Sequence, residues 1–201
     1  MTTTASRSLH DVGAAIGRLT DVLARRPAAG VHDDSVASAH WDGSLSITTR
    51  HANGTQFTTD MPPECGGSGA SVTPGWLFRA GIASCATTVI ATHAAARGIA
   101  LQTLEIACSS RSDTCGMLGL PGADGRPAPA AAFDMRLHVR IGAANAGEAE
   151  LRALVDTGVR CSPAPSALSA SPPVVTIEIV AHAEPAESAA AQAPLLAADI
   201  V

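Results

Sequence analysis

The chain has 201 residues, a formal net charge of −5 and 46% hydrophobic but only 2% aromatic side chains. This length suits one domain whose core is built from Ala, Val, Leu and Ile, and such a thin aliphatic core makes a second subunit a plausible source of stability. Every basic residue is arginine and none of them forms a basic stripe, so we expect no nucleic-acid partner. No apolar run reaches the length of a membrane span without polar interruption, so we expect no membrane partner.

The cysteines limit the kinds of site to expect. Their number is odd and their spacing has no repeat: they are Cys65, Cys85, Cys108, Cys115 and Cys161. This pattern argues against a disulfide framework and against a zinc ribbon, so we expect no metal and no cofactor. Residues 1–30 lack the continuous apolar stretch of a secretory signal. We therefore expect a cytoplasmic protein whose thiols start reduced.

The first third of the chain predicts a helix followed by three strands. Apolar residues recur at three- and four-residue steps over residues 8–26, which predicts an accessory helix within an N-terminal segment, 1–33; a partly disordered leader is the alternative. Short strands are expected at 35–41, 44–51 and 55–60. The pairs Asp42-Gly43 and Asn53-Gly54 are typical two-residue hairpin turns, so we expect a β-meander.

The remainder predicts an α+β domain over residues 34–183. A long helix is expected from Pro74 to Arg97, ended by Gly98, with a stripe formed by Phe78, Ile82, Cys85, Val89, Thr92 and Ala96. The other expected elements are strands at 100–110, 133–142 and 174–183, a helix at 146–160 and a long loop between the first two of these strands. The two main helices should cover a largely antiparallel sheet, and residues 184–201 should form a flexible tail.

Two thiols occupy core-facing helix positions, Cys85 within the long helix and Cys161 at the end of the second main helix. If the two helices pack side by side, the sulfurs can meet. One thiolate would then attack a peroxide O–O bond and the other would resolve the sulfenic acid as a disulfide. The alternative is that both are small core residues, which is how free cysteines usually behave.

Two stretches resemble a known family. The segment "GGSGASVTPGWLFRAGIASCATTVIATHAAARGIALQTLEI" and, later, "EAELRALVDTGVRCSPAPSAL" look like the OsmC/Ohr family of osmotically induced and organic-hydroperoxide-resistance proteins. The resemblance extends over roughly residues 35–182. It implies an OsmC-like fold in an intertwined homodimer, with the long helices at its centre and two active sites at the subunit interface. It also implies a stress-defence peroxidase that consumes an organic hydroperoxide and a thiol reductant.

The resemblance also assigns roles to residues. Cys85 matches the nucleophilic position and Cys161 the resolving position, and an apolar pocket near the long helix would include Phe78, Ile82 and Val89. The family's glutamate near the start of the helix is replaced by Gly75 here. The family's activating arginine lies in the first hairpin, where "WDGSLS" has none. Arg50 is the nearest substitute, and Arg79 and Arg160 are the alternatives.

Two functions remain open from the sequence. The first is a two-cysteine peroxidase that uses Cys85, Cys161 and Arg50. The second is a small-ligand-binding dimer of the same fold in which the cysteines only pack. The missing glutamate and the displaced arginine motivate this second function.

Overall fold

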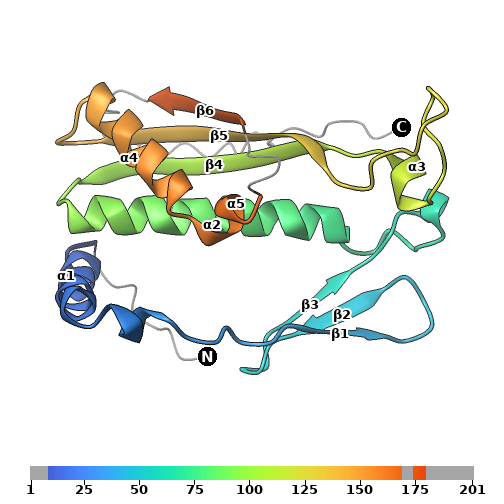
Figure 1. The fold of residues 1–201 in the computed structure, drawn as a ribbon, viewed down its shortest axis with the longest axis horizontal. Helices are drawn as coiled ribbons and strands as arrows, with labels where there is room; N and C mark the ends of the chain where they lie inside the picture. Colours follow the sequence, from blue (N-terminus) through green and yellow to red (C-terminus); the bar gives the residue numbers. More distant parts are fainter. Residues whose placement is uncertain (1–8, 169–173, 180–201) are drawn as a thin grey trace, which may run out of the picture.

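Two separate sheets flank one long helix in the computed structural model, which describes residues 9–168 and 174–179 (Figure 1). The helices are α1 (Leu9–Arg25), α2 (Pro74–Ala96), α3 (Thr114–Met117), α4 (Glu148–Arg160) and α5 (Pro163–Ser166), with short 3-10 turns η1 (Pro27–Gly30) and η2 (Pro63–Cys65). The strands are β1 (Ser38–Trp41), β2 (Ile47–Arg50), β3 (Gln56–Thr59), β4 (Leu101–Arg111), β5 (Phe133–Ala143) and β6 (Val174–Ile179). The α+β class and the expected order of the main elements are confirmed.

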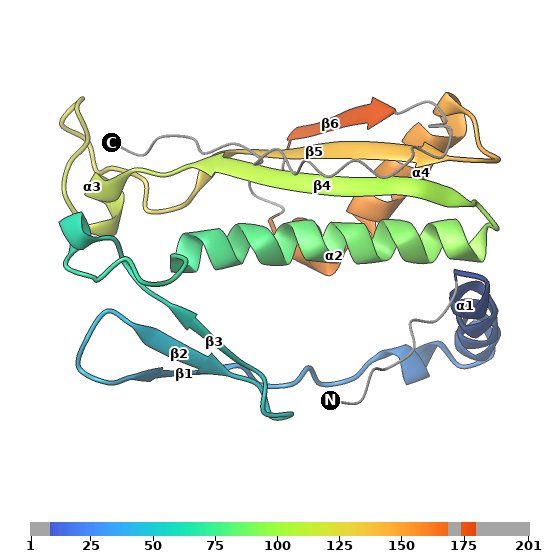
Figure 2. The ribbon, with the colours of Figure 1, turned by 180° about the vertical axis from the view of Figure 1, so that it is seen from behind.

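The strands form two sheets where we expected one. Strands β1, β2 and β3 make an antiparallel meander of their own, while β4 and β5 pair antiparallel and β6 joins β5 in parallel. Figure 2, from behind, shows the meander below the N-terminal end of α2 and α1 below its C-terminal end. Short-range hairpin signals predict which strands pair with each other, but they contain no information on where the resulting sheet docks.

The two hairpin turns are longer than the predicted two residues. The last paired residues of β1 and β2 are Trp41 and Ile47, so five residues separate the strands. Asp42 Oδ1 accepts hydrogen bonds from the backbone N–H of Ser44, at 3.3 Å, and from its hydroxyl, at 2.8 Å. This side-chain turn, with Gly43 at φ 103°, reverses the chain before the ladder can begin.

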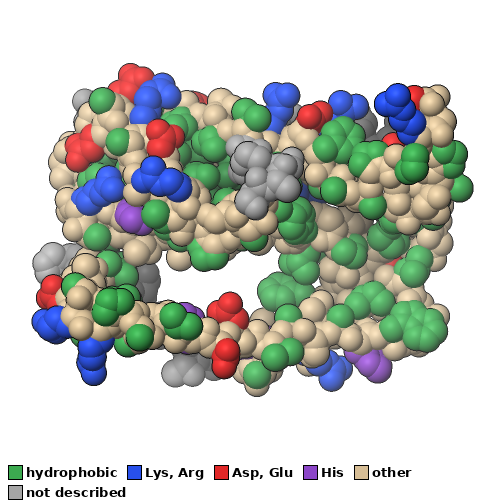
Figure 3. Space-filling view, in the orientation of Figure 1, with side chains coloured by type: hydrophobic (Ala, Val, Ile, Leu, Met, Phe, Trp, Pro, Cys, Tyr) green, Lys and Arg blue, Asp and Glu red, His purple; other side chains and the backbone are tan. Residues whose placement is uncertain are grey.

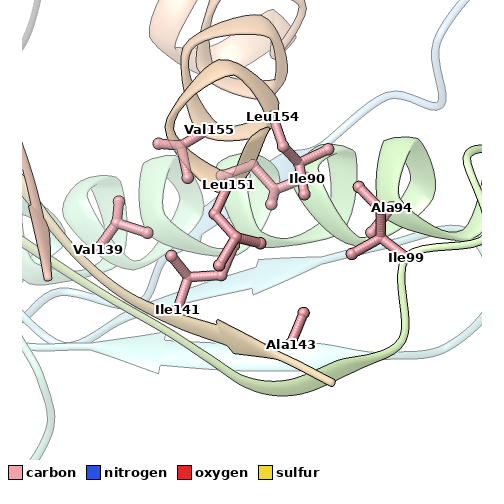
Figure 4. Packing of buried hydrophobic residues seen from close by; sticks show 9 residues of the cluster. All are labelled: Ile90, Ala94, Ile99, Val139, Ile141, Ala143, Leu151, Leu154 and Val155. Atoms are coloured by element: carbon pink, nitrogen blue, oxygen red, sulfur yellow. The ribbon is translucent and has the colours of Figure 1, made fainter. Parts of the chain in front are cut away.

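The core lies between the β4–β5–β6 sheet and the helices α2 and α4, which cover the same face of that sheet (Figure 4). Its larger cluster comprises Ile90, Ala94, Ile99, Val139, Ile141, Ala143, Leu151, Leu154 and Val155. A second cluster around the middle of α2 comprises Ile82, Ala86, Met135 and Leu137. The opposite face of the sheet is charged: Arg140 pairs with Glu105 at 3.0 Å and with Glu178 at 3.5 Å.

Helix α2 begins and ends close to the predicted residues, but its buried stripe differs. Thr73 Oγ1 caps the first turn by accepting from the Trp76 N–H at 3.1 Å, and Gly98 at φ 67° follows the C-terminus. The fully buried positions are Ile82, Ala86, Ile90 and Ala94. Of the stripe we predicted, only Ile82 is fully buried. The others are half-buried (Cys85, Val89 and Thr92) or exposed (Phe78 and Ala96). A helix with small and apolar residues nearly all round gives no clear periodicity, so its core face could not be read from sequence.

Part of the prediction falls outside the described residues. The parts concerned are residue 8 at the start of the first predicted helix, the end of the last predicted strand at 180–183 and the expected tail at 184–201. The predicted long loop between β4 and β5 contains the short helix α3 and an isolated bridge between Pro121 and Pro127.

Candidate functional site

Cys85 lies in the middle of α2, half-buried and next to the fully buried Ala86. Its Sγ accepts a hydrogen bond from the backbone N–H of Ala164, at 3.5 Å. Ala164 belongs to α5, three residues beyond Cys161 in the sequence. The chain segment that carries the second thiol therefore lies directly against the first.

A close helix crossing brings this segment to Cys85. A Cβ added to Gly158 of α4 would overlap the Ile90 side chain of α2, so the glycine lets the two helices approach. The fully buried Ser162 then donates its hydroxyl to the Gly158 carbonyl at 2.8 Å, which fixes the turn between α4 and α5. Cys161 occupies the C-cap of α4 and is exposed, so the prediction that it faces the core is wrong: it lies one residue beyond the last residue of the amphipathic helix. Both thiols are free.

Arg50 is exposed at the end of β2, where it pairs with Gln56 in the meander. Among the described residues, no arginine donates a hydrogen bond to the Cys85 sulfur. The arginine on α2 itself, Arg79, donates to the Ser110 hydroxyl on β4 at 3.4 Å. A single chain therefore does not complete the thiol–guanidinium arrangement that the sequence led us to expect.

Cys108 on β4 is the thiol near Arg79. Burial raises the pKa of the Cys108 thiol, and the charge of Arg79 offsets this effect only in part. The side chain packs against the second core cluster. A protonated thiol in that position behaves as a small hydrophobic residue, so Cys108 is a poor nucleophile.

An apolar pocket of about 390 Å³ lies between the meander and the first turns of α2. Phe78 lines it, together with Ala39, Ile47, Thr49, Thr59, Pro74 and Leu77. Ile82, predicted to belong to such a pocket, is 2% exposed and lies in the core instead. Phe78 is seven residues before Cys85, about two helical turns or roughly 10 Å along the axis, so this pocket does not contain the thiol.

Asp60 is a buried carboxylate that the sequence analysis did not single out. It is 1% exposed, and its oxygens accept from the Met61 N–H at 2.8 Å, the Ser68 N–H at 3.1 Å, the Ser68 hydroxyl at 2.5 Å and the Ala70 N–H at 3.2 Å. It closes the glycine-rich loop before α2, in which a Cβ on Gly67 would overlap the Met61 carbonyl. The signal for it was present, since a loop of Gly and Pro has orphan N–H groups and an acid at its start can accept them.

The Asp60 carboxylate should make stability depend on acid pH. The Ser68 hydroxyl and the backbone N–H donors hold the pKa of Asp60 below its ordinary value, against the opposing effect of burial. A depressed folded-state pKa stabilises the fold fully above the unfolded pKa, about 4, and this contribution is lost as the pH falls through the folded value. We expect Asp60→Asn to lower the melting temperature by several degrees at pH 7.

Thermal melts of both proteins between pH 7 and pH 2.5 test this expectation. The difference in melting temperature between the wild type and Asp60→Asn should narrow below about pH 4, since the wild-type carboxylate is then protonated and uncharged like the amide. A gap that stays constant over the whole range would contradict a role for the ionised carboxylate.

The part of the chain that the structure describes contains neither a metal-ligand cluster nor a membrane-spanning helix. Over residues 9–168 and 174–179, no three His, Cys, Asp or Glu side chains gather closely enough to hold a metal ion. Within the same residues, none of the helices combines the length and hydropathy needed to cross a lipid bilayer.

The fold resembles solved structures of low sequence identity. An OsmC-like protein from Mycoplasma pneumoniae superposes with a TM-score of 0.62 at 19% identity, over 75% of this chain and 100% of that one. An organic hydroperoxide resistance protein from Legionella pneumophila gives 0.54 at 20% identity, over 75% and 99%. An OsmC-like protein of unknown function from Vibrio cholerae gives 0.56 at 13% identity, over 74% and 100%.

The sequence itself also matches a family model. No curated protein sequence matches the chain closely enough to count as a relative. The model described as OsmC-like protein matches residues 67–178, which is more than half of the chain and includes α2, α4, Cys85 and Cys161. The chain therefore belongs to the family of OsmC-like proteins.

Proposed function

We propose that this protein is a thiol peroxidase that reduces organic hydroperoxides, with Cys85 as nucleophile and Cys161 as resolving thiol. The observation that carries the proposal is the 3.5 Å contact between the Cys85 sulfur and the Ala164 N–H, because it places the Cys161 segment beside the first thiol. Membership of the OsmC-like family supports it, as does the Legionella pneumophila structure, a protein named for organic hydroperoxide resistance.

In the proposed cycle, the two cysteines reduce one hydroperoxide and a dithiol then reduces the resulting disulfide. The Cys85 thiolate attacks one oxygen of the O–O bond, which breaks, and the organic alkoxide takes up a proton and leaves as an alcohol. The sulfenic acid on Cys85 is attacked by the Cys161 thiol, which forms a disulfide and releases water. A dithiol supplies two electrons and two protons to restore both thiols. A cytoplasmic location, which we propose from the free thiols, would provide such a reductant.

The activating cation would come from a second copy of the chain. We call residues 26–60, the linker after α1 and the meander, the N-terminal arm. The arm extends away from the β4–β5–β6 sheet and the helices packed on it. Figure 3 shows an open window between the arm and α2. The arm also exposes large apolar side chains: Val31, Val36, Trp41, Leu45 and Phe57. An intertwined homodimer would cover these side chains and would bring Arg50 of one arm towards α2 of the partner.

The surface of α2 is suited to this dimer. Its exposed positions include Gly81, Ser84 and Thr88, which lie at successive helical steps and have small side chains. Small residues let a second helix approach closely. Apolar side chains on α2 on either side of Cys85, Phe78 two turns before it and the half-buried Val89 one turn after it, would favour an organic over a small polar peroxide once the partner's arm encloses the thiol.

The test is the covalent state of the thiols after one equivalent of cumene hydroperoxide is added to the fully reduced protein. Peptide mass spectrometry under non-reducing conditions should show a Cys85–Cys161 disulfide forming within seconds. In Cys161→Ser, a sulfenic acid should remain on Cys85 and react with a dimedone probe. Oxidation that is slow, or that falls on Cys65 or Cys115 instead, would contradict the proposal.

The second candidate function is a small-ligand-binding dimer of the same fold. It is favoured by one observation: among the described residues, no guanidinium in the chain lies in hydrogen-bond reach of the Cys85 sulfur. In that case the two thiols are packing residues. The protein would bind hydrophobic ligands equally well with both thiols replaced by serine.

A further inference from the structure

Helix α1 lies outside the region that the family model matches, and it packs on the far end of α2. A pocket of about 490 Å³ lies at the junction and is lined mainly by small residues, among them Gly13, Ala14, Ala95, Ala96 and Gly98. Gly13 makes the closest approach, since a Cβ added there would lie 2.5 Å from the Ala95 carbonyl oxygen. Helix α1 is therefore seated on the C-terminal end of its own α2.

The N-terminal arm connects this contact between α1 and α2 to the opposite end of α2. From α1 the chain runs through η1 and an extended stretch to the meander, which lies at the N-terminal end of α2 (Figures 1 and 2). The arm, α1 and α2 together surround the window seen in Figure 3. The stretch along the window exposes Val31 by 84% and Val36 by 79%. With Trp41, Leu45 and Phe57 they make the arm a largely unburied apolar surface, which is typical of a surface that a partner covers.

We propose that α1 is a clasp that closes each arm around the second copy of the chain. The inference rests on the intertwined homodimer of the proposed function. The occupant of the window is the partner's chain, because the apolar arm borders the opening on one side and α2, whose exposed positions carry small side chains, borders it on the other (Figure 3), and a two-fold axis pairs each with its counterpart. With both clasps seated, the subunits encircle each other. They separate only after α1 leaves its own α2.

This arrangement predicts slow subunit exchange controlled by the α1–α2 contact. A side chain at Gly13 has to displace backbone atoms of α2, which is costly because they are held in the helix. Gly17, one turn later on α1, has nothing within 4 Å of an added Cβ. The same substitution at the two glycines therefore changes helix propensity equally, but it disturbs the contact between α1 and α2 only at Gly13.

The experiment mixes isotopically labelled and unlabelled full-length protein and follows mixed dimers by native mass spectrometry. We expect Gly13→Gln to exchange subunits about tenfold faster than the wild type or more, and Gly17→Gln to exchange at the wild-type rate. Deletion of residues 1–25, which removes α1 entirely, should accelerate exchange at least as much. The deletion keeps the test decisive if the Gly13 variant fails to fold.

The outcomes separate the clasp from the dimer. A wild type that is monomeric at micromolar concentration would overturn both the clasp and the dimer of the proposed function. A wild-type dimer whose exchange rate is unchanged by Gly13→Gln and by the deletion would overturn the clasp alone. Equal acceleration by Gly13→Gln and Gly17→Gln would also overturn it, since the contact with Ala95 would then be irrelevant.

Discussion

Replacing Cys85 by serine is expected to reduce hydroperoxide turnover by at least about a thousandfold, because the variant has no thiolate to attack the O–O bond. The fold should survive. The side chain is half-buried and nearly isosteric, and a serine hydroxyl can still accept the hydrogen bond from the Ala164 N–H. The measurement is consumption of cumene hydroperoxide with excess dithiol, together with a thermal melt of each protein.

Two cysteine variants serve as controls for this result. Cys108→Ser replaces a thiol that also packs beside α2 but whose pKa is raised by burial, so turnover should stay at the wild-type level. Cys161→Ser should consume about one equivalent of hydroperoxide quickly and then slow down, because the sulfenic acid has no partner to resolve it. Full turnover by Cys85→Ser would exclude the peroxidase and favour the ligand-binding dimer.

Replacing Gly158 by valine is expected to lower the free energy of unfolding by about 3 kcal/mol, at the upper end of overpacking costs. The new side chain would overlap Ile90 where α4 crosses α2, and the Ile90 Cα lies 3.1 Å from the added Cβ. The helices would have to separate at the crossing that brings the Cys161 segment to Cys85. The variant should therefore also form the Cys85–Cys161 disulfide more slowly.

Urea denaturation at one fixed protein concentration measures the loss of stability. Gly17→Val is the matched control, because it places the same side chain on an open helix surface and should change stability by no more than about 0.5 kcal/mol. A double-mutant cycle with Ile90→Ala should show that the two substitutions are not additive, since trimming Ile90 relieves the overlap. An unchanged unfolding midpoint in Gly158→Val would show that the crossing is not close-packed.

The sequence predicted the bounds of elements well where local capping or strand alternation marked them. Helix α2 was expected over 74–97 and extends over Pro74–Ala96, and the expected strand 133–142 extends over Phe133–Ala143. Thr73 and Gly98 delimit α2 through local capping, which requires no tertiary contact. The resemblance to the OsmC/Ohr family, stated on the same residues, is confirmed by the family model and by the fold.

Only part of the candidate site could be predicted from the sequence. The sequence singled out Cys85 within a helix and Cys161 at the end of another, but it expected both to face the core, whereas Cys161 is exposed. The roles of both thiols remain proposals. The sequence did not reveal the Ala164 contact, the Ser162 hydrogen bond or the Asp60 carboxylate. The first two join groups whose partners are set by how the loops close, and a hydrophobic pattern contains no signal for them. Asp60 had a local signal, an acid at the start of a loop rich in Gly and Pro, but that signal is not a hydrophobic pattern either.

The amino-acid sequence by itself thus determined the order of helices and strands, the ends of α2, and the positions of Cys85 within α2 and of Cys161 at the end of α4, because these depend on local patterning and capping. Only the tertiary structure decided which face of α2 is buried, how closely α4 approaches it at Gly158, and that the meander forms its own sheet on an extended arm. The reason is physical: α2 is small and apolar nearly all round, so its own sequence favours no single face. The partner surfaces select one through packing, and packing depends on residues far apart in the chain.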